Sequence, residues 1–511
     1  MRLTRNHILN ILWLLCVAWL ASGAAAQEPR PASLAELQKR LADHIAQPRF
    51  AAALWGVQIV SLDTGISLFE HNPQKLFSPA SNCKLFTVAL ALDRLGPDYQ
   101  IKTSLYANAK ANRRGTLKGE LVVYGRGDPT FNARLHGGDI CQALEPCVAA
   151  LTNAGVKRIT GGLVGDASFF HGPEFGAGWA WDDLEYYYGA EISALTINDN
   201  TLEVSVKPGP HPGAPCQLAL SPPTAYLSLS NLTATAPTGI KRDIVFYRPL
   251  GQNVVYISGR IPEDDPGYTD KVTFSNPAGL FVWFLREALA RHGIKVRGKL
   301  RTGRCVDGQA SPFDTGKTIE LGSVDSLPLR EIVREVQKPS QNLYTDLLLA
   351  HVGERLRVAG MSETSEELGV RELNKFLDEA GVPKGEVIFE EGSGLSRDNL
   401  ATPRATVTLL RYMSRHRWAQ VYLDALPIAG VDGTLKNHMK GTPAEGNVRA
   451  KTGTLRWANS LSGYVTTAAG ERLSFSVMLN RYDSPDRDHS ARAEVEAIAI
   501  LLAAFTGRSG G

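Results

Sequence analysis

The sequence predicts an α/β domain, a sheet flanked by helices, that is interrupted by inserted β-rich domains. Strand and helix patterns occur together at both ends of the chain, whereas the middle is strand-rich with frequent Gly, Pro and Asn turns. The length of 511 residues allows about three domains of roughly 150 residues each. We therefore expect the two ends of the chain to form one domain and the middle to be inserted into it.

Hydrophobic periodicity defines the elements of the first part. Residues 33–45 have the spacing of an amphipathic helix, with Ser33 as its cap. Two strands joined by an Asp63-Thr64-Gly65 turn follow, and then a helix that Gly96-Pro97 ends. The predicted ranges are 53–61 and 66–70 for the strands and 81–95 for the second helix.

Strand patterns dominate from about residue 102 to 314, and helical patterns return at 329–356. Three alternating apolar segments at 448–455, 460–467 and 473–479 predict late strands, and 497–505 predicts a terminal helix that packs on a sheet. The predicted division is a signal at 1–26, the first part of the sheet-and-helix domain at 27–104, an inserted region of two β-rich domains at 105–313, and the second part at 314–511.

The composition is that of an ordinary globular protein. Apolar residues make up 43% and charged residues 21% of the chain, which excludes a disordered chain, a collagen and a coiled coil. The formal net charge is only +3 and no basic block occurs, so no nucleic-acid partner is expected. Peripheral contact with a membrane and the oligomeric state stay open at this point.

The first 26 residues have the pattern of an export signal. Arg2 and Arg5 precede an apolar run at 8–20, and three alanines at 24–26 offer a cleavage site. The run is about 13 residues long, shorter than the ~20 that cross a bilayer, which favours a cleaved signal over an uncleaved anchor. We predict an exported protein, located in the periplasm of a Gram-negative bacterium.

Cysteine usage suits an exported chain. Cys141 and Cys147 could close a short loop and Cys216 could pair with Cys305, which would leave Cys83 as the free thiol. Neither a C-x-x-C pair nor an H-E-x-x-H motif occurs, so we expect no metal site.

Three short motifs carry the chemistry. They are S-x-x-K at the start of the second predicted helix, S-x-N at a helix-loop boundary and K-T-G on a predicted strand, and each pattern occurs once. In the sequence they are Ser81-Asn82-Cys83-Lys84, Ser340-Gln341-Asn342 and Lys451-Thr452-Gly453. Their order along the chain is the order that penicillin-recognising serine enzymes use.

The spacing explains why these residue types belong together. Residues three apart share a helix face, so Lys84 lies beside Ser81 and could take its proton. Lys84 is a base only if burial or a second cation, such as Lys451, lowers its pKa. In the alternative, Ser81 is a helix N-cap and Lys84 is a solvated residue, but that leaves the other two motifs unexplained.

Together with Gly125-Arg126-Gly127-Asp128-Pro129-Thr130-Phe131 and Gly392-Ser393-Gly394-Leu395-Ser396-Arg397, these motifs resemble the D-alanyl-D-alanine carboxypeptidase/endopeptidase family, the low-molecular-mass class C penicillin-binding proteins. The resemblance covers about residues 35 to 507. It implies a serine β-lactamase/transpeptidase-like domain and an enzyme without a cofactor, which acts on peptidoglycan stem peptides and is covalently inhibited by β-lactam antibiotics. The first two motifs are 340 − 81 = 259 residues apart, whereas in a compact serine β-lactamase they lie much closer together.

The resemblance also implies a role for each residue of the site. Ser81 is the acylated nucleophile, Lys84 its base, and Ser340 the group that passes a proton to the leaving amine. The substrate-binding residues it implies are Asn342 for the amide, Lys451, Thr452 and Gly453 for the terminal carboxylate, and the backbone N–H groups of Ser81 and Thr454 for the oxyanion.

One further site residue comes from the segment Gly178-Trp179-Ala180-Trp181-Asp182-Asp183-Leu184. By the resemblance, Asp183 binds the free amino end of a diaminopimelate side chain, and in the alternative both aspartates are solvated. The neighbouring tryptophans and tyrosines are explained equally by core packing and by substrate contact. Cys83, inside the nucleophile motif, is expected to be a buried small hydrophobe.

Two other functions stay as alternatives. A serine β-lactamase would hydrolyse its acyl-enzyme quickly. A non-catalytic penicillin-sensing or cell-wall-binding protein would keep the fold, but it would not need both lysines.

Overall fold

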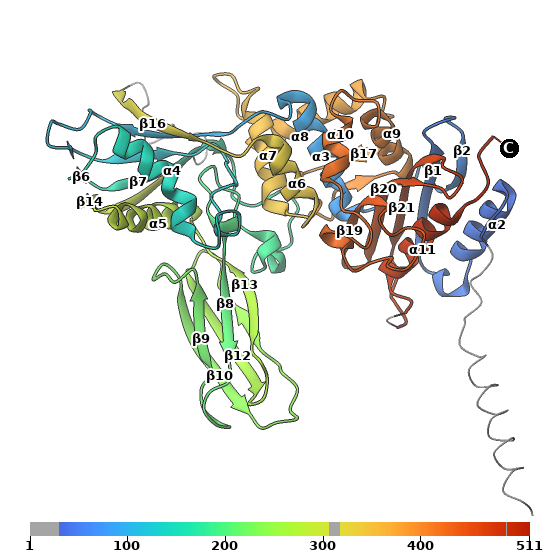
Figure 1. The fold of residues 1–511 in the computed structure, drawn as a ribbon, viewed down its shortest axis with the longest axis horizontal. Helices are drawn as coiled ribbons and strands as arrows, with labels where there is room; N and C mark the ends of the chain where they lie inside the picture. The colour runs from blue at the N-terminus through green and yellow to red at the C-terminus, as the bar shows by residue number, and fades with distance from the viewer. Residues whose placement is uncertain (1–29, 306–316, 487, 511) are drawn as a thin grey trace, which may run out of the picture.

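The computed structural model describes residues 30–305, 317–486 and 488–510. The predicted export signal at 1–26 lies outside these residues. Figure 1 shows a long body with a sheet at each end and an arm of strands that projects from it. None of the helices in the described ranges is both long and apolar enough to cross a membrane.

One five-stranded sheet is built from two strands near the start of the described chain and three strands near its end. It is antiparallel, and β1 pairs along its whole length with β21, from Leu54 opposite Asn480 to Ser61 opposite Leu473. All five strands correspond to predicted ones. In sheet order they are β19 (Arg449–Leu455), β20 (Ala458–Thr466), β21 (Arg472–Asn480), β1 (Leu54–Ser61) and β2 (Ser67–His71).

Helices cover both faces of this sheet, as predicted for an α/β domain. On one face α2 (Leu34–Ile45) and α11 (Ala491–Ala504) share a core with the strands, and the Ser33 hydroxyl caps α2 by accepting from the Glu36 N–H at 3.2 Å. The other face carries a second core of six helices. They are α3 (Cys83–Leu95), α6 (Leu329–Gln337), α7 (Asn342–Glu354), α8 (Ser365–Glu379), α9 (Pro403–Met413) and α10 (Ala419–Ala425), with the short strands β17 (Val387–Ile388) and β18 (Leu400–Ala401) beside them.

The inserted region enters and leaves through two paired strands. β3 (Lys102–Ala107) and β16 (Ile319–Asp325) are antiparallel, with Lys102 opposite Asp325. They form one side of a five-stranded sheet whose other strands are β5 (Leu121–Tyr124), β7 (Leu163–His171) and β15 (Leu300–Cys305). The inserted region also contains a small three-stranded sheet of β4 (Thr116–Leu117), β6 (Arg158–Ile159) and β14 (Lys295–Val296).

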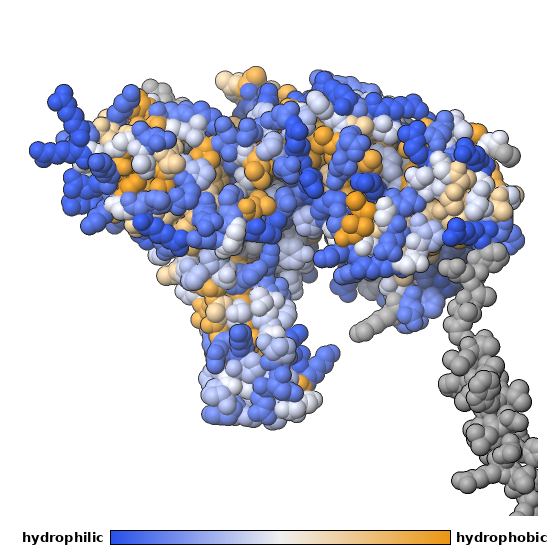
Figure 2. Space-filling view, in the orientation of Figure 1, coloured by the Kyte–Doolittle hydropathy of each residue, from blue (hydrophilic) through white to orange (hydrophobic). Residues whose placement is uncertain are grey.

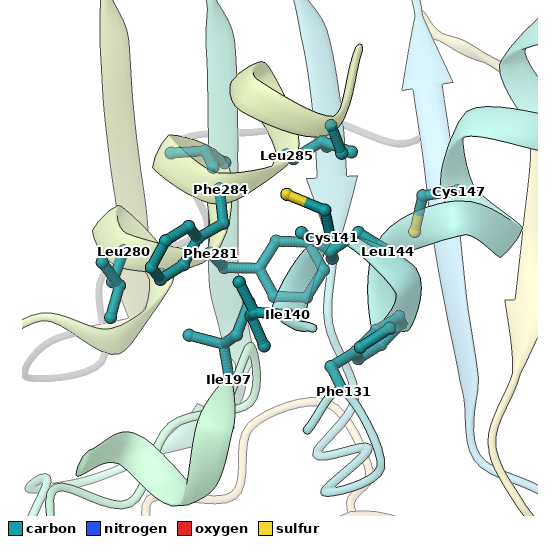
Figure 3. Packing of buried hydrophobic residues seen from close by; sticks show 14 of the residues in the cluster. Phe131, Ile140, Cys141, Leu144, Cys147, Ile197, Leu280, Phe281, Phe284 and Leu285 are labelled. Atoms are coloured by element: carbon teal, nitrogen blue, oxygen red, sulfur yellow. The ribbon is translucent and has the colours of Figure 1, made fainter. Parts of the chain in front are cut away.

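Two long helices in the inserted region differ from the strand-rich expectation. α4 (Ile140–Asn153) and α5 (Pro277–Arg291) pack against this sheet and against each other in one apolar core (Figure 3). Both helices were hard to predict from the sequence. Pro146 lies inside α4, and α5 buries residues on nearly all sides, which weakens its helical period.

The predicted disulfides are wrong. Cys141 and Cys147 both lie on α4 as buried free thiols (Figure 3). Six residues of helix rise about 9 Å, more than the Cα separation that a disulfide allows. Cys216 is also a buried free thiol, and the side chain of Cys305 lies outside the described ones.

The arm consists of two three-stranded sheets (Figure 1). Hydrophilic residues cover most of its tip in the view of Figure 2. Its strands are β13 (Tyr268–Thr273), β8 (Thr201–Lys207) and β9 (Gln217–Ser221) in one sheet, and β10 (Ser228–Ala236), β12 (Val254–Pro262) and β11 (Val245–Tyr247) in the other.

Candidate active site

Ser81 lies in a tight turn that leads into α3. The turn is a 3₁₀ segment, Ala80–Asn82, and Ala80 has φ 49°, in the left-handed region that non-glycine residues rarely adopt. The α-helix itself begins at Cys83, and the residue at its N-cap position is Asn82, whose side chain makes no capping bond. The alternative role of Ser81 as an N-cap is therefore wrong.

Lys84 is fully buried and points at three acceptors. Its Nζ donates to Ser81 Oγ at 2.9 Å, to Asn342 Oδ1 at 2.7 Å and to the Ser393 carbonyl at 2.6 Å. These acceptors come from the first motif, from the second motif and from the 392–397 segment. An ammonium group has three protons, so the three bonds use all of them.

Burial also makes Lys84 a usable base. Removal from water lowers its pKa to about 8, while the carboxyl groups of Asp346 and Glu391 act in the opposite direction. Burial, and then the charge of Lys84, hold the pKa of Lys451 well below its usual range. Of the two causes expected from the sequence, burial is the one that lowers the pKa of Lys84.

Ser340 lies at the junction between two helices. α6 ends at Gln337 and α7 begins at Asn342, and Ser340 between them has φ 65°. Lys451 Nζ donates to Ser340 Oγ at 2.7 Å and to the Thr452 carbonyl at 2.9 Å. The structure thus makes a second lysine–serine pair from two motifs that are 451 − 340 = 111 residues apart.

The third motif lies on β19, the edge strand of the sheet beside the Ser81 turn. A Cβ atom on Gly453 would lie 2.5 Å from the Pro79 carbonyl oxygen and 2.2 Å from Ser460 Oγ. Glycine at this position lets the strand approach the nucleophile turn. Thr452 Oγ1 is 2.8 Å from Thr434 Oγ1, and Thr454 is exposed at the end of the strand.

Asp183 belongs to an inserted segment that reaches the site. The Asn342 side-chain amide donates to the Tyr188 carbonyl at 2.9 Å, which ties this segment to the second motif. Asp183 is half-buried, and burial, followed by the charge of Asp182, raises its pKa, while Arg397 of the 392–397 segment opposes the shift. Asp182 is exposed.

The aromatic side chains around Asp183 are not core residues. Trp181 is 73% exposed, and Tyr186 and Tyr187 are about half exposed. Core packing therefore does not explain these three rings, whereas Trp179 and Tyr188 are half-buried.

Two buried carboxyl groups were missed by the sequence analysis. Asp346 lies one helical turn after Asn342 on α7, and Glu391 directly precedes the 392–397 segment. Their place next to two motifs is the signal that could have revealed them. A cavity of about 580 Å³ lies between the inserted region and α7 and α8, and its lining includes Asp346 but not Ser81, Lys84 or Lys451.

The chain is similar to known proteins over nearly its whole length. Residues 37–502 match the model of the D-Ala-D-Ala carboxypeptidase 3 (S13) family. The chain is 33% identical over 505 residues to a D-alanyl-D-alanine carboxypeptidase of Actinomadura sp. (strain R39), an alignment that covers 97% of this chain and 89% of the relative. It is 28% identical over 433 residues to the D-alanyl-D-alanine carboxypeptidase DacB of Haemophilus influenzae, which covers 83% and 84%.

Solved structures share the fold. The crystal structure of penicillin binding protein 4 from Haemophilus influenzae superimposes with a TM-score of 0.73 at 24% identity, over 92% of this chain and 98% of the other. Both the sequence match over nearly the whole chain and the shared fold support the resemblance inferred from the motifs. The chain belongs to the D-Ala-D-Ala carboxypeptidase 3 (S13) family.

Proposed function

We propose that this protein is an exported serine D-Ala-D-Ala carboxypeptidase that acts on peptidoglycan stem peptides through an acyl-enzyme on Ser81. The observation that carries the proposal is the convergence of two buried lysines on two serines. Lys84 Nζ lies 2.9 Å from Ser81 Oγ, and Lys451 Nζ lies 2.7 Å from Ser340 Oγ. A serine hydroxyl becomes a nucleophile when a neighbouring base takes its proton, and this site offers such a base.

In the acylation step, neutral Lys84 accepts the Ser81 proton. Its two N–H groups stay on Asn342 Oδ1 and the Ser393 carbonyl, so its lone pair is directed at Ser81. The Ser81 oxygen attacks the carbonyl carbon of the penultimate D-alanine, and the backbone N–H groups of Ser81 and Thr454 stabilise the oxyanion.

The leaving group departs at Ser340 and Lys451, the second lysine–serine pair. Ser340, held by Lys451, passes its hydroxyl proton to the leaving amine of the terminal D-alanine as the C–N bond breaks. The proton that Lys84 took from Ser81 then restores the Ser340 hydroxyl and leaves Lys84 neutral again. Water then hydrolyses the ester on Ser81 and regenerates the hydroxyl. The same acyl transfer would cut a D-alanyl cross-link, so the one site serves carboxypeptidase and endopeptidase reactions.

Substrate recognition uses groups on both sides of Ser81. Lys451, Thr452 and Gly453 receive the terminal carboxylate, and Asn342 holds the peptide amide. Among the described residues, the charge that acts on buried Lys451 is the repulsive one of Lys84, so a substrate carboxylate would supply its counter-charge. Asp183, beside exposed aromatic rings, binds the free amine of a stem-peptide side chain.

The cellular setting follows from the substrate class. We place the mature protein in the periplasm of a Gram-negative bacterium after cleavage of residues 1–26, with β-lactam antibiotics as covalent inhibitors. We also propose that the predicted parts 27–104 and 314–511 form the peptidase domain and 105–313 the insertion, with both borders moved outward so that the insertion includes β3 and β16.

The proposal is tested with benzylpenicillin and with a pentapeptide that ends in D-Ala-D-Ala. Mass spectrometry with peptide mapping should find a stable adduct on Ser81, and the unlabelled enzyme should release free D-alanine. Ser81→Ala should lose both signals. An adduct on a different serine contradicts the mechanism, rapid release of hydrolysed penicillin indicates a β-lactamase, and an adduct without any D-alanine release indicates a penicillin-sensing protein.

A further inference from the structure

Two buried acidic groups behind Lys84 have no role in the proposed mechanism. Asp346 is 3% exposed and Glu391 is fully buried. A buried ion costs several kcal/mol unless it is paired and hydrogen-bonded. Two neighbouring carboxyl groups at the base of an active site therefore need a physical explanation.

Glu391 is surrounded by hydrogen-bond donors. Its two oxygens accept five hydrogen bonds, from two side chains and three backbone N–H groups that all follow it closely in sequence. The donors are Ser393 N at 2.8 Å, Ser393 Oγ at 2.5 Å, Gly394 N at 2.7 Å, Ser396 N at 3.3 Å and Asn399 Nδ2 at 2.6 Å. Such a set of donors suits a charged carboxylate.

Asp346 has the opposite surroundings. Its Oδ1 accepts from the Gly392 N–H at 3.2 Å, but its buried Oδ2 receives no donor from the described residues. Gly392, whose N–H bonds to Asp346, directly follows Glu391 in the chain, so the two buried carboxyl groups are neighbours. A side-chain hydrogen bond between them is one of the causes that raise the pKa of Asp346. Two carboxylates cannot form a hydrogen bond, so one of them must carry a proton.

The surroundings place that proton on Asp346. Burial and then the charge of Glu391 raise the pKa of Asp346 well above its usual range, with a smaller contribution from Glu366 on α8. A protonated Oδ2 can donate to Glu391. That bond also satisfies the oxygen that otherwise has no partner.

The Asp346–Glu391 pair is connected to Lys84 through Asn342 and Ser393, which both accept hydrogen bonds from Lys84 Nζ. Asn342 lies one turn before Asp346 on α7, and Ser393 is bonded to Glu391 through its own N–H and hydroxyl. The titratable groups that face Lys84 are Asp346 on α7, Glu391 in the loop before β18, Lys451 on β19 and the Cys83 thiol on α3.

We infer that Asp346 and Glu391 act as one positioning unit, a buried carboxyl pair that shares a single proton and presents one negative charge to Lys84. Two negative charges would keep Lys84 as an ammonium ion, which cannot accept the Ser81 proton. Without any negative charge nearby, the pKa of Lys84 would fall further and Lys84 would be a weaker base. The Ser393 segment, whose carbonyl accepts from Lys84, would also lose its hydrogen bonds to the Glu391 carboxylate. This inference rests on the proposed function, because it assigns the pair to the same base.

The test is the pH dependence of Ser81 acylation by a fluorescent penicillin, measured between about pH 5 and 10. The rate of the wild-type protein should rise with pH through the titration of Lys84. Glu391→Gln removes the charge, so the midpoint of this rise should move to lower pH by about one to three units. Asp346→Ala removes the proton donor and leaves Glu391 with an unshared charge, so the midpoint should move to higher pH.

Rescue by a conservative variant separates this role from a merely structural one. Asp346→Asn has the shape of the protonated acid and can still donate to Glu391, so it should bring the midpoint back from that of Asp346→Ala. Asp128→Asn, which alters a buried carboxyl in the inserted region, is the matched control and should leave the midpoint unmoved. If Asp346→Asn shifts the midpoint as Glu391→Gln does, Asp346 is ionised and the inference is wrong. It is also wrong if no variant shifts the midpoint.

A second measurement does not depend on activity. The infrared difference between the wild-type protein and Asp346→Asn at neutral pH should contain the carbonyl stretch of an un-ionised carboxylic acid. If this carbonyl stretch is absent, the pair does not share a proton and the inference is wrong. This measurement does not use Glu391→Gln, so it decides the question even if thermal melting shows that this variant does not fold. Failure of the wild-type protein to be acylated on Ser81 would instead reject the proposed function and leave the infrared result standing.

Discussion

The two buried lysines of the site have contrasting surroundings. Lys84 has two carboxyl groups behind it, which partly offset the cost of burial, and its pKa is about 8. Lys451 is equally buried, but in the described part of the chain the charge that acts on it is the repulsive one of Lys84. The two lysine side chains therefore differ in the source of their counter-charge. One is a base with its counter-charge built in, and the other is a binding group whose counter-charge comes with the substrate.

The largest expected effect comes from Lys84, the lysine with the two carboxyl groups beside it. Lys84→Ala should slow acylation of Ser81 by about 10²–10⁴-fold, because general acid–base groups contribute rate factors of this size. The measurement is the rate of fluorescent penicillin labelling, with circular dichroism as the control for folding. A nearly normal rate would show that Ser81 has another base.

Lys451→Ala should have the next largest effect, and the effect should depend on the substrate carboxylate. Loss of one partner of a buried charge pair costs about 2–4 kcal/mol, or roughly 30- to 1000-fold. A peptide with a free terminal carboxylate should lose most of its kcat/KM, whereas the already slow cleavage of its C-terminal amide should change less. Equal losses for both peptides would argue against a carboxylate-binding role.

Asp183→Ala should have a smaller and selective effect. A charge-assisted hydrogen bond contributes about 1.5–3 kcal/mol, so cleavage of a peptide with a free side-chain amine should slow by at least about tenfold. Penicillin labelling should change little, since penicillin lacks that amine. Asp182→Ala is the matched control on the same segment. A loss of both reactions in Asp183→Ala would indicate a structural role.

The smallest expected effect concerns the nucleophile itself. Ser81 does not cap α3, so Ser81→Ala should lower the free energy of unfolding by less than the ~1 kcal/mol of a lost N-cap. Urea unfolding of the two proteins measures this difference. A larger loss would mean that the turn at Ala80, or the burial of Lys84 beside it, depends on the serine hydroxyl.

Much of the fold could be predicted because its signals are local. The strands of the first sheet and the helix α2 with its Ser33 cap occur close to their predicted ranges. The helices α4 and α5 were missed, because an internal proline and an all-round apolar surface hide the helical period. The disulfides were wrong because spacing in sequence does not show that Cys141 and Cys147 share one helix.

The sequence by itself determined the family and the proximity of Ser81 and Lys84, since a helical turn, here the 3₁₀ turn that leads into α3, brings residues three apart to the same side. Only the tertiary structure decided which groups meet these two residues. Ser340 and Lys451 come from a helix junction and an edge strand, and Asp346 and Glu391 come from two further segments. The charge state of each lysine depends on burial and on such distant neighbours, because desolvation and Coulomb energies are set by what surrounds a group in space and not by its neighbours in sequence.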